Sequence, residues 1–261
     1  MTATTKHASR VLVEVIADSP SGALLAEQAG ADRIELCCAV AEGGLTPSLG
    51  LLRETLAVVR IPVVAMLRPR RGDFLYAADE FRVMQRDLDV LLQNGAHGIA
   101  TGALLADGAI DEIRVAELVR AAGSVPVTFH RAFDCVRDPQ RALETLVDLG
   151  VARLLTSGLA ATATAGAARI RALHEQARSR LSIIAGAGVR AHNVAALLVA
   201  TRVTEVHLSA SRFDPSAMQH RNPAVAMGTQ PAVDEFSVRA TDANEIAGVA
   251  SAARAATLPR P

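Results

Sequence analysis

Residues 127–134 read Val-Thr-Phe-His-Arg-Ala-Phe-Asp, and the rest of the chain is organised around this stretch. Its first four residues alternate between apolar and polar side chains, the period-two pattern of a buried β-strand. Four groups able to do chemistry follow at its end: His130, Arg131, Asp134 and Cys135. Ionisable groups are costly to bury unless they are paired or used, so this strand end predicts a functional site. A core histidine beside a surface ion pair is the alternative.

Similar strands recur along the chain, and a segment with the pattern of a helix follows each of them. The eight expected strands cover residues 11–16, 33–37, 62–67, 98–101, 125–131, 153–156, 181–185 and 203–208. Strands that alternate with helices indicate right-handed βαβ crossovers and a parallel sheet. Eight such units predict an α/β fold, a single-domain (β/α)8 TIM barrel, rather than an open Rossmann sheet.

One domain is expected to account for most of the chain. We expect a disordered tail over residues 1–10, the barrel over residues 11–256 and a second tail over residues 257–261. The long irregular segment 212–240 separates the eighth strand from the last helix. Its length favours a functional or interface loop over a domain boundary.

Composition excludes several classes of protein. Lys plus Arg and Asp plus Glu both number 27, so no charge excess predicts nucleic acid or a membrane surface as a partner. The chain has no Trp and one Tyr, too few aromatic residues for a base-stacking surface. No apolar run approaches the roughly 18 residues of a membrane-spanning helix. Three cysteines, two of them adjacent, fit a reducing, cytoplasmic compartment.

Polar side chains converge on the inside of the predicted barrel. The period of two directs Glu14, Glu35, His130 and His207 inward, because the apolar residues of each strand must face the helices. We predict that these four residues are catalytic, with the carboxyl groups as general acids or bases and the imidazoles as proton carriers near neutral pH. The alternative is a structural ion network. Arg33, lower on its strand, is expected to be the structural partner of a carboxylate on the eighth strand.

A second set of residues is placed to bind a carboxylate or phosphate of a substrate. Guanidinium groups bind such anions bidentately, and the loops after the seventh and eighth barrel strands often present backbone N–H groups to a phosphate. The predicted substrate-binding residues are Arg68, Arg131, Asp134, Thr156, Ser157, Gly186, Gly188 and Ser209. Strand parity is expected to direct Thr156 into the barrel. Alternatively, the glycines serve tight turns for backbone reasons alone.

The cysteines are the candidates for a metal site. Cys37 and Cys38 are neighbours at a strand end, so their side chains should diverge, and they form no CxxC pair. Soft thiolates suit Cu(I), and Cys37 and Cys135 with a histidine are candidate ligands across the mouth of the barrel. Alternatively, buried thiols act only as small hydrophobic side chains.

Several stretches between the first strand and Asn222 carry a family signature. They are residues 30–37 (Gly-Ala-Asp-Arg-Ile-Glu-Leu-Cys), 42–48 (Glu-Gly-Gly-Leu-Thr-Pro-Ser), 68–70, 72–74, 127–134, 155–158, 185–189, 205–207 and 209–210. Together they resemble the CutC family of copper homeostasis proteins. The sequence departs from the family pattern at Arg71, where a glycine is usual, and at Leu208, where a serine is common.

The resemblance implies a TIM barrel, a cytoplasmic location, a homodimer or higher homo-oligomer, and copper homeostasis through Cu(I) binding, with Cys37 as the first candidate ligand. The predicted barrel mouth indicates a different ligand, because carboxylate, guanidinium and imidazole groups suit a small anionic molecule better than a soft ion. A second hypothesis is therefore a lyase, isomerase or hydrolase acting on a small phosphorylated or carboxylated compound. A non-catalytic binding or scaffold protein is the third.

Overall fold

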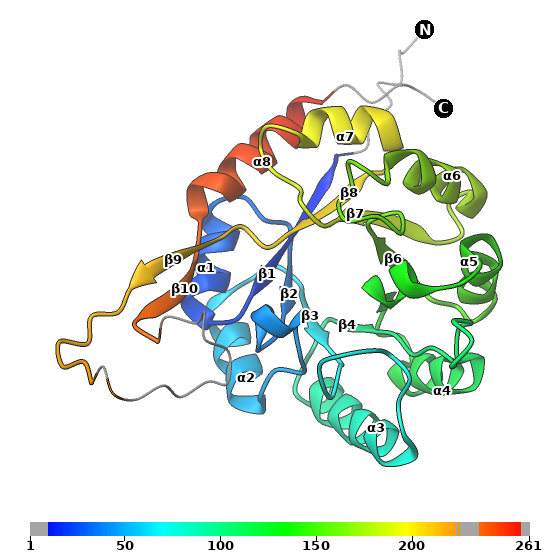
Figure 1. Cartoon of the computed structure of the whole chain (residues 1–261), viewed down its shortest axis with the longest axis horizontal. Coiled ribbons are helices and arrows are strands. Elements are labelled where there is room, and N and C mark those ends of the chain that lie inside the picture. The colour runs from blue at the N-terminus through cyan, green and yellow to red at the C-terminus, as the bar shows by residue number, and fades with distance from the viewer. Residues whose placement is uncertain (1–9, 223, 225–234, 257–261) are drawn as a thin grey trace, which may run out of the picture.

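Eight parallel strands close into a barrel at the centre of the computed structural model (Figure 1). The structure describes residues 10–222, 224 and 235–256. Each barrel strand pairs with the next along the chain, and β8 pairs with β1. The strands are β1 (Leu12–Ala17), β2 (Arg33–Leu36), β3 (Val63–Met66), β4 (Gly98–Thr101), β5 (Val127–Phe129), β6 (Arg153–Thr156), β7 (Ser182–Gly186) and β8 (Glu205–Leu208). The predicted TIM barrel is confirmed.

Helices form the outer ring around the strands (Figure 1). They are α1 (Pro20–Gln28), α2 (Leu49–Val58), α3 (Ala78–Gln93), α4 (Glu112–Ala122), α5 (Pro139–Asp148), α6 (Ala167–Ala177), α7 (Val194–Thr201) and α8 (Ala243–Ala255). Ser19 and Asp138 cap α1 and α5 with their side chains, and each of these helices begins with a proline. Within the described ranges, no helix is both long and apolar enough to cross a membrane.

Strand β5 is shorter than the sequence pattern suggests. The expected strand covers residues 125–131, whereas the observed ladder ends at Phe129. His130 leaves the ladder because it caps the 3-10 helix η2 (Arg131–Cys135), where its Nδ1 accepts a hydrogen bond from the Ala132 N–H at 3.2 Å. The polar residues of the opening stretch therefore lie just after the strand, at the rim of the barrel.

The segment between β8 and α8 contains two strands that the sequence analysis did not predict. Strands β9 (Ser211–Pro215) and β10 (Ser237–Thr241) form an antiparallel pair that projects from the barrel (Figure 1). The expectation of an irregular loop over residues 212–240 is therefore wrong at both ends of this range, where the chain forms strands. Its residues 223 and 225–234 lie outside the described residues, as do residues 1–9 and 257–261 of the expected tails.

Apolar side chains fill the space between strands and helices, whereas the barrel interior combines polar side chains with a small apolar cluster that includes Val64, Met66 and Ala100. On β1, Val13 and Val15 are fully buried in the main hydrophobic core, and the intervening Glu14 points the other way, toward buried polar partners. Successive side chains of a strand face opposite sides of a sheet, so one parity serves the core and the other serves the interior. This division brings the candidate residues together.

Candidate functional site

A cavity of about 510 Å³ lies at the carboxyl ends of the barrel strands. Strands in a closed parallel barrel all end on one face, so short polar segments from distant parts of the sequence meet there. The wall residues that matter most below are Glu35, Cys37, Met66, Arg68, His130 and His207.

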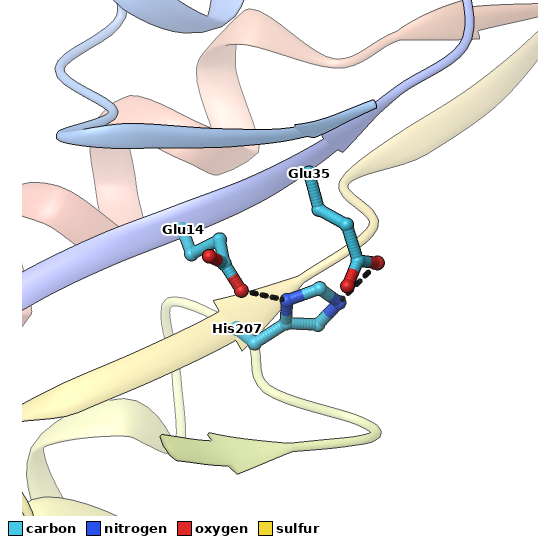
Figure 2. A group of neighbouring side chains, drawn as sticks. All are labelled: Glu14, Glu35 and His207. Carbon is cyan, nitrogen blue, oxygen red and sulfur yellow. Dashed lines mark hydrogen bonds and ion pairs between the residues drawn. The ribbon is translucent and has the colours of Figure 1, made fainter. Parts of the chain in front are cut away.

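Glu14, His207 and Glu35 form a line of buried polar groups beside this cavity, here called the Glu–His–Glu triad (Figure 2). Oε1 of Glu14 lies 2.8 Å from Nδ1 of His207, and Nε2 of His207 lies 3.6 Å from Oε2 of Glu35. The sheet register explains this arrangement, because Glu14 pairs with His207 on β8 and with Arg33 on β2, two residues before Glu35. The structure thus brings together three of the four predicted catalytic residues.

The members of the triad differ in charge. Burial disfavours ionised Glu14, but Arg33 and the hydrogen bond from His207 outweigh it and hold the pKa of Glu14 at about 2. Burial raises the pKa of Glu35 to about 7; His207 opposes this rise and Glu14 adds to it. Burial also disfavours protonated His207, but Glu35 and Glu14 outweigh it and raise the pKa of the imidazole above its usual value. A permanently ionised carboxylate therefore lies beside an imidazole whose protonated form is favoured, and Glu35 can exchange a proton near neutral pH.

Arg33 connects the triad to Glu205, which lies two residues before His207 on β8. Its guanidinium pairs with Glu14 and, at 2.5 Å, with Oε2 of Glu205 on β8. Ser182 on β7 donates its hydroxyl to the other oxygen of Glu205 at 2.5 Å. The prediction of a structural pair between Arg33 and a carboxylate of the eighth strand is confirmed.

His130, the fourth predicted catalytic residue, lines the same cavity but does not belong to the triad. Its Nδ1 accepts the hydrogen bond from Ala132, so Nε2 carries the proton of the neutral ring. Burial and the nearby charge of Arg68 lower the pKa of His130 to about 3. The imidazole is therefore a neutral hydrogen-bond donor at physiological pH. Gly102 makes room for it, since a Cβ at that position would lie 2.7 Å from the ring.

Arg68 is a buried cation in the cavity wall. Nη1 donates to the carbonyl oxygens of Glu42 and Gly44 at 2.9 and 3.2 Å, and Nη2 donates to that of Gly72 at 2.9 Å. The guanidinium carbon lies 5.1 Å from the centre of the Phe74 ring. Arg68 therefore fastens two loops at the rim through neutral carbonyl groups.

Asp134 organises the predicted substrate-binding residues on the β5 and β6 side. It accepts hydrogen bonds from the Thr156 hydroxyl at 2.5 Å, the Ser157 N–H at 3.0 Å and Nε of Arg131 at 2.8 Å. Asp134 and Arg131 line the cavity. Thr156 and Ser157 are not among the described residues that line the cavity. They hold the carboxylate of Asp134 in place through their hydrogen bonds.

The expected inward orientation of Thr156 is corrected by the register of β6. Arg153 and Leu155 share the inward parity: Nε of Arg153 donates to the Thr128 hydroxyl at 3.0 Å, and Leu155 lines the cavity. Thr156 therefore faces the opposite side of the strand, where Asp134 accepts its hydroxyl.

The predicted phosphate-binding residues are split between the cavity wall and the sheet. Gly188 and Ser209 line the cavity. Gly186 lies within β7 and pairs with His207, and a Cβ at this glycine would lie 2.6 Å from the side chain of Leu155. Gly186 thus permits a close approach of side chains.

Two of the three free cysteines reach the cavity. Cys37 is fully buried in its wall, and burial raises the pKa of the thiol far above its ordinary value. Cys135 lines the cavity from the exposed rim. The side chain of Cys38 turns away and donates to the Thr46 carbonyl at 3.1 Å, as expected for neighbours on a strand.

The triad is also the one preformed cluster of potential metal ligands among the described residues. One ligand atom from each of Glu14, Glu35 and His207 lies within 4.8 Å of the others, and the cluster includes neither Cys37 nor Cys135. Oxygen and nitrogen donors of this kind suit divalent ions better than Cu(I). A cation there would compete with Arg33 for Glu14.

Sequence reasoning did not single out three further wall residues: Met66, Phe74 and Arg190. Met66 shares its strand parity with Arg68, so the alternation rule could have found it. Phe74 and Arg190 lie in loops, where no periodic pattern predicts the direction of a side chain.

Comparison with known proteins identifies relatives over most of the chain. The model of the CutC family matches residues 11–212. A copper homeostasis protein cutC homolog from Homo sapiens is 44% identical over 239 residues, which are 92% of this chain and 88% of the human protein. The mouse homolog is 45% identical over 90% of this chain and 86% of its own length. The crystal structure of CutC from Streptococcus agalactiae has a TM-score of 0.73 and 31% identity, and the match covers 76% of this chain and 97% of that chain.

Proposed function

The chain belongs to the CutC family, and from that membership we propose that it serves in copper homeostasis, the role for which its human and mouse relatives are named. We also propose a cytoplasmic location. The three cysteines are free, as is usual for proteins of a reducing compartment.

In this role the chain binds Cu(I) at the mouth of the barrel, with Cys37 as the principal ligand and Cys135 as a second. The observation that supports this most is that both thiols line one cavity, together with the thioether residue Met66 and the imidazole of His130. Sulfur and imidazole donors fit Cu(I) in kind. Because burial keeps the Cys37 thiol protonated, copper must displace its proton, and Cu(I) affinity should rise with pH.

Competition with a Cu(I) chelator tests this function. Cys37→Ser should lower the affinity at least about tenfold, since a serine oxygen is a poor ligand for Cu(I). Cys38→Ser is the matched control, because the side chain of Cys38 bonds to Thr46 instead of lining the cavity. Glu35→Gln should leave Cu(I) affinity unchanged. Equal affinities in all variants would reject copper binding by Cys37.

A second candidate function is enzymatic and rests on the Glu–His–Glu triad. Ionised Glu14 orients His207 through Nδ1, and Nε2 then faces Glu35, whose pKa of about 7 permits it to accept or release a proton near neutral pH. Gly188, Ser209 and Arg131 at the same cavity supply donors for an anionic group. The triad favours a lyase, isomerase or hydrolase of a small phosphorylated or carboxylated compound.

We further propose a homodimer or higher homo-oligomer. The projecting β9–β10 pair presents Phe213 at 69% and Val238 at 55% exposure, and exposed apolar side chains on a protruding element favour contact with another copy. Light scattering coupled to gel filtration measures the mass directly. A monomeric mass would reject this proposal.

A further inference from the structure

Three buried side chains in the cavity wall each have a polar atom without a hydrogen-bond partner among the described residues. The atoms are Oε1 of Glu35, Nε of Arg68 and Nε2 of His130, and the three residues are 2%, 6% and 4% exposed. Buried polar groups in folded proteins are nearly always paired, because an unpaired one loses its bonds to water without replacement. Three such groups around one cavity indicate that a ligand supplies the missing partners.

Two of the unpaired atoms are donors on the same side of the cavity. Nε2 of neutral His130 carries a proton because Nδ1 accepts from Ala132, and Nε of Arg68 always carries one. The Phe74 ring lies 5.1 Å from both the His130 ring and the Arg68 guanidinium carbon, so the two donors flank one aromatic side chain.

The charge of Arg68 defines the group that these donors recognise. No carboxylate of the described residues lies within ion-pair distance of Arg68. Its terminal nitrogens donate to backbone carbonyl groups, and its side-chain neighbour Tyr76 is a neutral phenol. A buried guanidinium without a counter-charge favours an anionic partner, and a carboxylate matches its geometry.

The third unpaired atom calls for a different group on the ligand. Oε1 of Glu35 has no partner, while Oε2 of the same carboxyl faces His207 at 3.6 Å. A hydroxyl both donates and accepts, so it can pair with Glu35 in either protonation state. The cavity volume of about 510 Å³ accommodates a molecule of a few carbon atoms with its water.

We propose that the cavity binds a small hydroxycarboxylate, whose carboxylate accepts hydrogen bonds from Arg68 and His130 and whose hydroxyl pairs with Glu35. This assignment rests on the second candidate function above and narrows its substrate class. It gives Arg68 and His130 the recognition of the acid group and Glu35 the recognition of the neighbouring hydroxyl.

Calorimetric titration of the full chain with D-glycerate, propionate and glycerol tests the assignment. Propionate lacks the hydroxyl groups and glycerol lacks the carboxylate. The wild type should bind D-glycerate at least about tenfold more tightly than either, because each comparison removes a buried hydrogen-bonding group. Absence of saturable D-glycerate binding would overturn the proposal.

Two variants separate the roles. His130→Asn keeps a side chain able to cap η2 but removes the Nε2 donor, so it should weaken binding of both acids about tenfold. Glu35→Met should abolish the preference for D-glycerate over propionate. His192→Asn, an exposed histidine outside the wall, is the matched control. Unchanged affinity for both acids in His130→Asn, or an unchanged preference in Glu35→Met, would overturn the assignment.

The same preparations distinguish failure of this inference from failure of the proposed functions. Hydroxycarboxylate binding as expected, with no turnover of any tested acid, would support the ligand assignment and count against the enzymatic candidate. The copper role is read separately from the Cu(I) affinity of Cys37→Ser.

Discussion

Replacing Arg33 with Met would remove the positive charge that two buried carboxylates share. Arg33 is 7% exposed and pairs with Glu14 on β1 and Glu205 on β8, so it joins the strands at which the barrel closes. Methionine is of similar length and fits the buried stem, so the principal loss is the charge and its hydrogen bonds. The two buried carboxylates would then lose the guanidinium that bonds to both of them, leaving His207 beside Glu14 and the more distant charge of Arg153.

The structure gives two routes to the size of this effect. The difference between the usual pKa of Glu14, 4.5, and its folded value of about 2 corresponds to about 3 kcal/mol of stabilisation of the ionised carboxylate. Removal of one partner from a buried ion pair costs about 3–5 kcal/mol in general. We therefore expect Arg33→Met to lower the free energy of unfolding at pH 8 by about 3–5 kcal/mol.

The loss should depend on pH with a definite sign. In the wild type the folded pKa of Glu14 is depressed, so its contribution is present above pH 4.5 and is lost as the pH falls toward 2. Without Arg33, burial raises the folded pKa of Glu14, so the variant loses stability as the pH rises through that value. The difference between wild type and variant should therefore be smaller at pH 5 than at pH 8.

Urea unfolding followed by circular dichroism at both pH values measures these differences. Arg180→Met is the matched control, because its pair with Glu144 is 42% and 43% exposed and should contribute far less. A loss for Arg33→Met below about 1 kcal/mol, the range of a surface pair, would show that Arg33 does not stabilise the two buried carboxylates. A loss that does not change with pH would show the same.

Three further predictions concern the triad, the close approach in β7 and the hairpin. Glu35→Gln should stabilise the protein at pH 8 by up to about 3 kcal/mol and have no effect near pH 4. The reason is that burial of the ionised carboxyl group is unfavourable only above its unfolded pKa. Equal unfolding curves for variant and wild type at pH 8 would contradict this. Gly186→Ala should cost about 1 kcal/mol in a thermal melt, because its Cβ would lie 2.6 Å from the terminal methyl Cδ1 of Leu155, which must shift. Gly50→Ala, where the nearest atom lies 3.9 Å away, should be neutral or stabilising, and equal melting temperatures for the two variants would refute the steric argument. Phe213→Ser should lower the mass measured by light scattering if the hairpin joins two copies, and an unchanged oligomeric mass would exclude that contact.

Alternation of side chains along strands was sufficient to predict that all three residues of the triad point into the barrel. Glu14, Glu35 and His207 each interrupt an apolar strand at the parity opposite to the core-facing residues. Closure of the barrel makes β1, β2 and β8 neighbours, so these three side chains must meet. A local pattern and one topological rule were enough.

The same rule failed where a strand carries mixed residues on both faces. On β6 the inward positions hold Arg153 and Leu155, so the small polar Thr156 was a misleading marker of the interior. The pairing of β9 with β10 joins segments separated by residues 216–236, a longer separation than the two to five residues of a usual hairpin loop. Phe74 reaches the cavity from a loop, and its direction depends on packing against Arg68 and His130.

X-ray absorption spectroscopy of the Cu(I)-loaded protein identifies the atoms bound to copper and so shows whether the Cys37 sulfur is one of them. We expect sulfur scatterers around copper in the wild type and in Cys38→Ser, and their loss or reduction in Cys37→Ser. A copper environment made only of oxygen and nitrogen in the wild type, like that of the Glu–His–Glu triad, would contradict it.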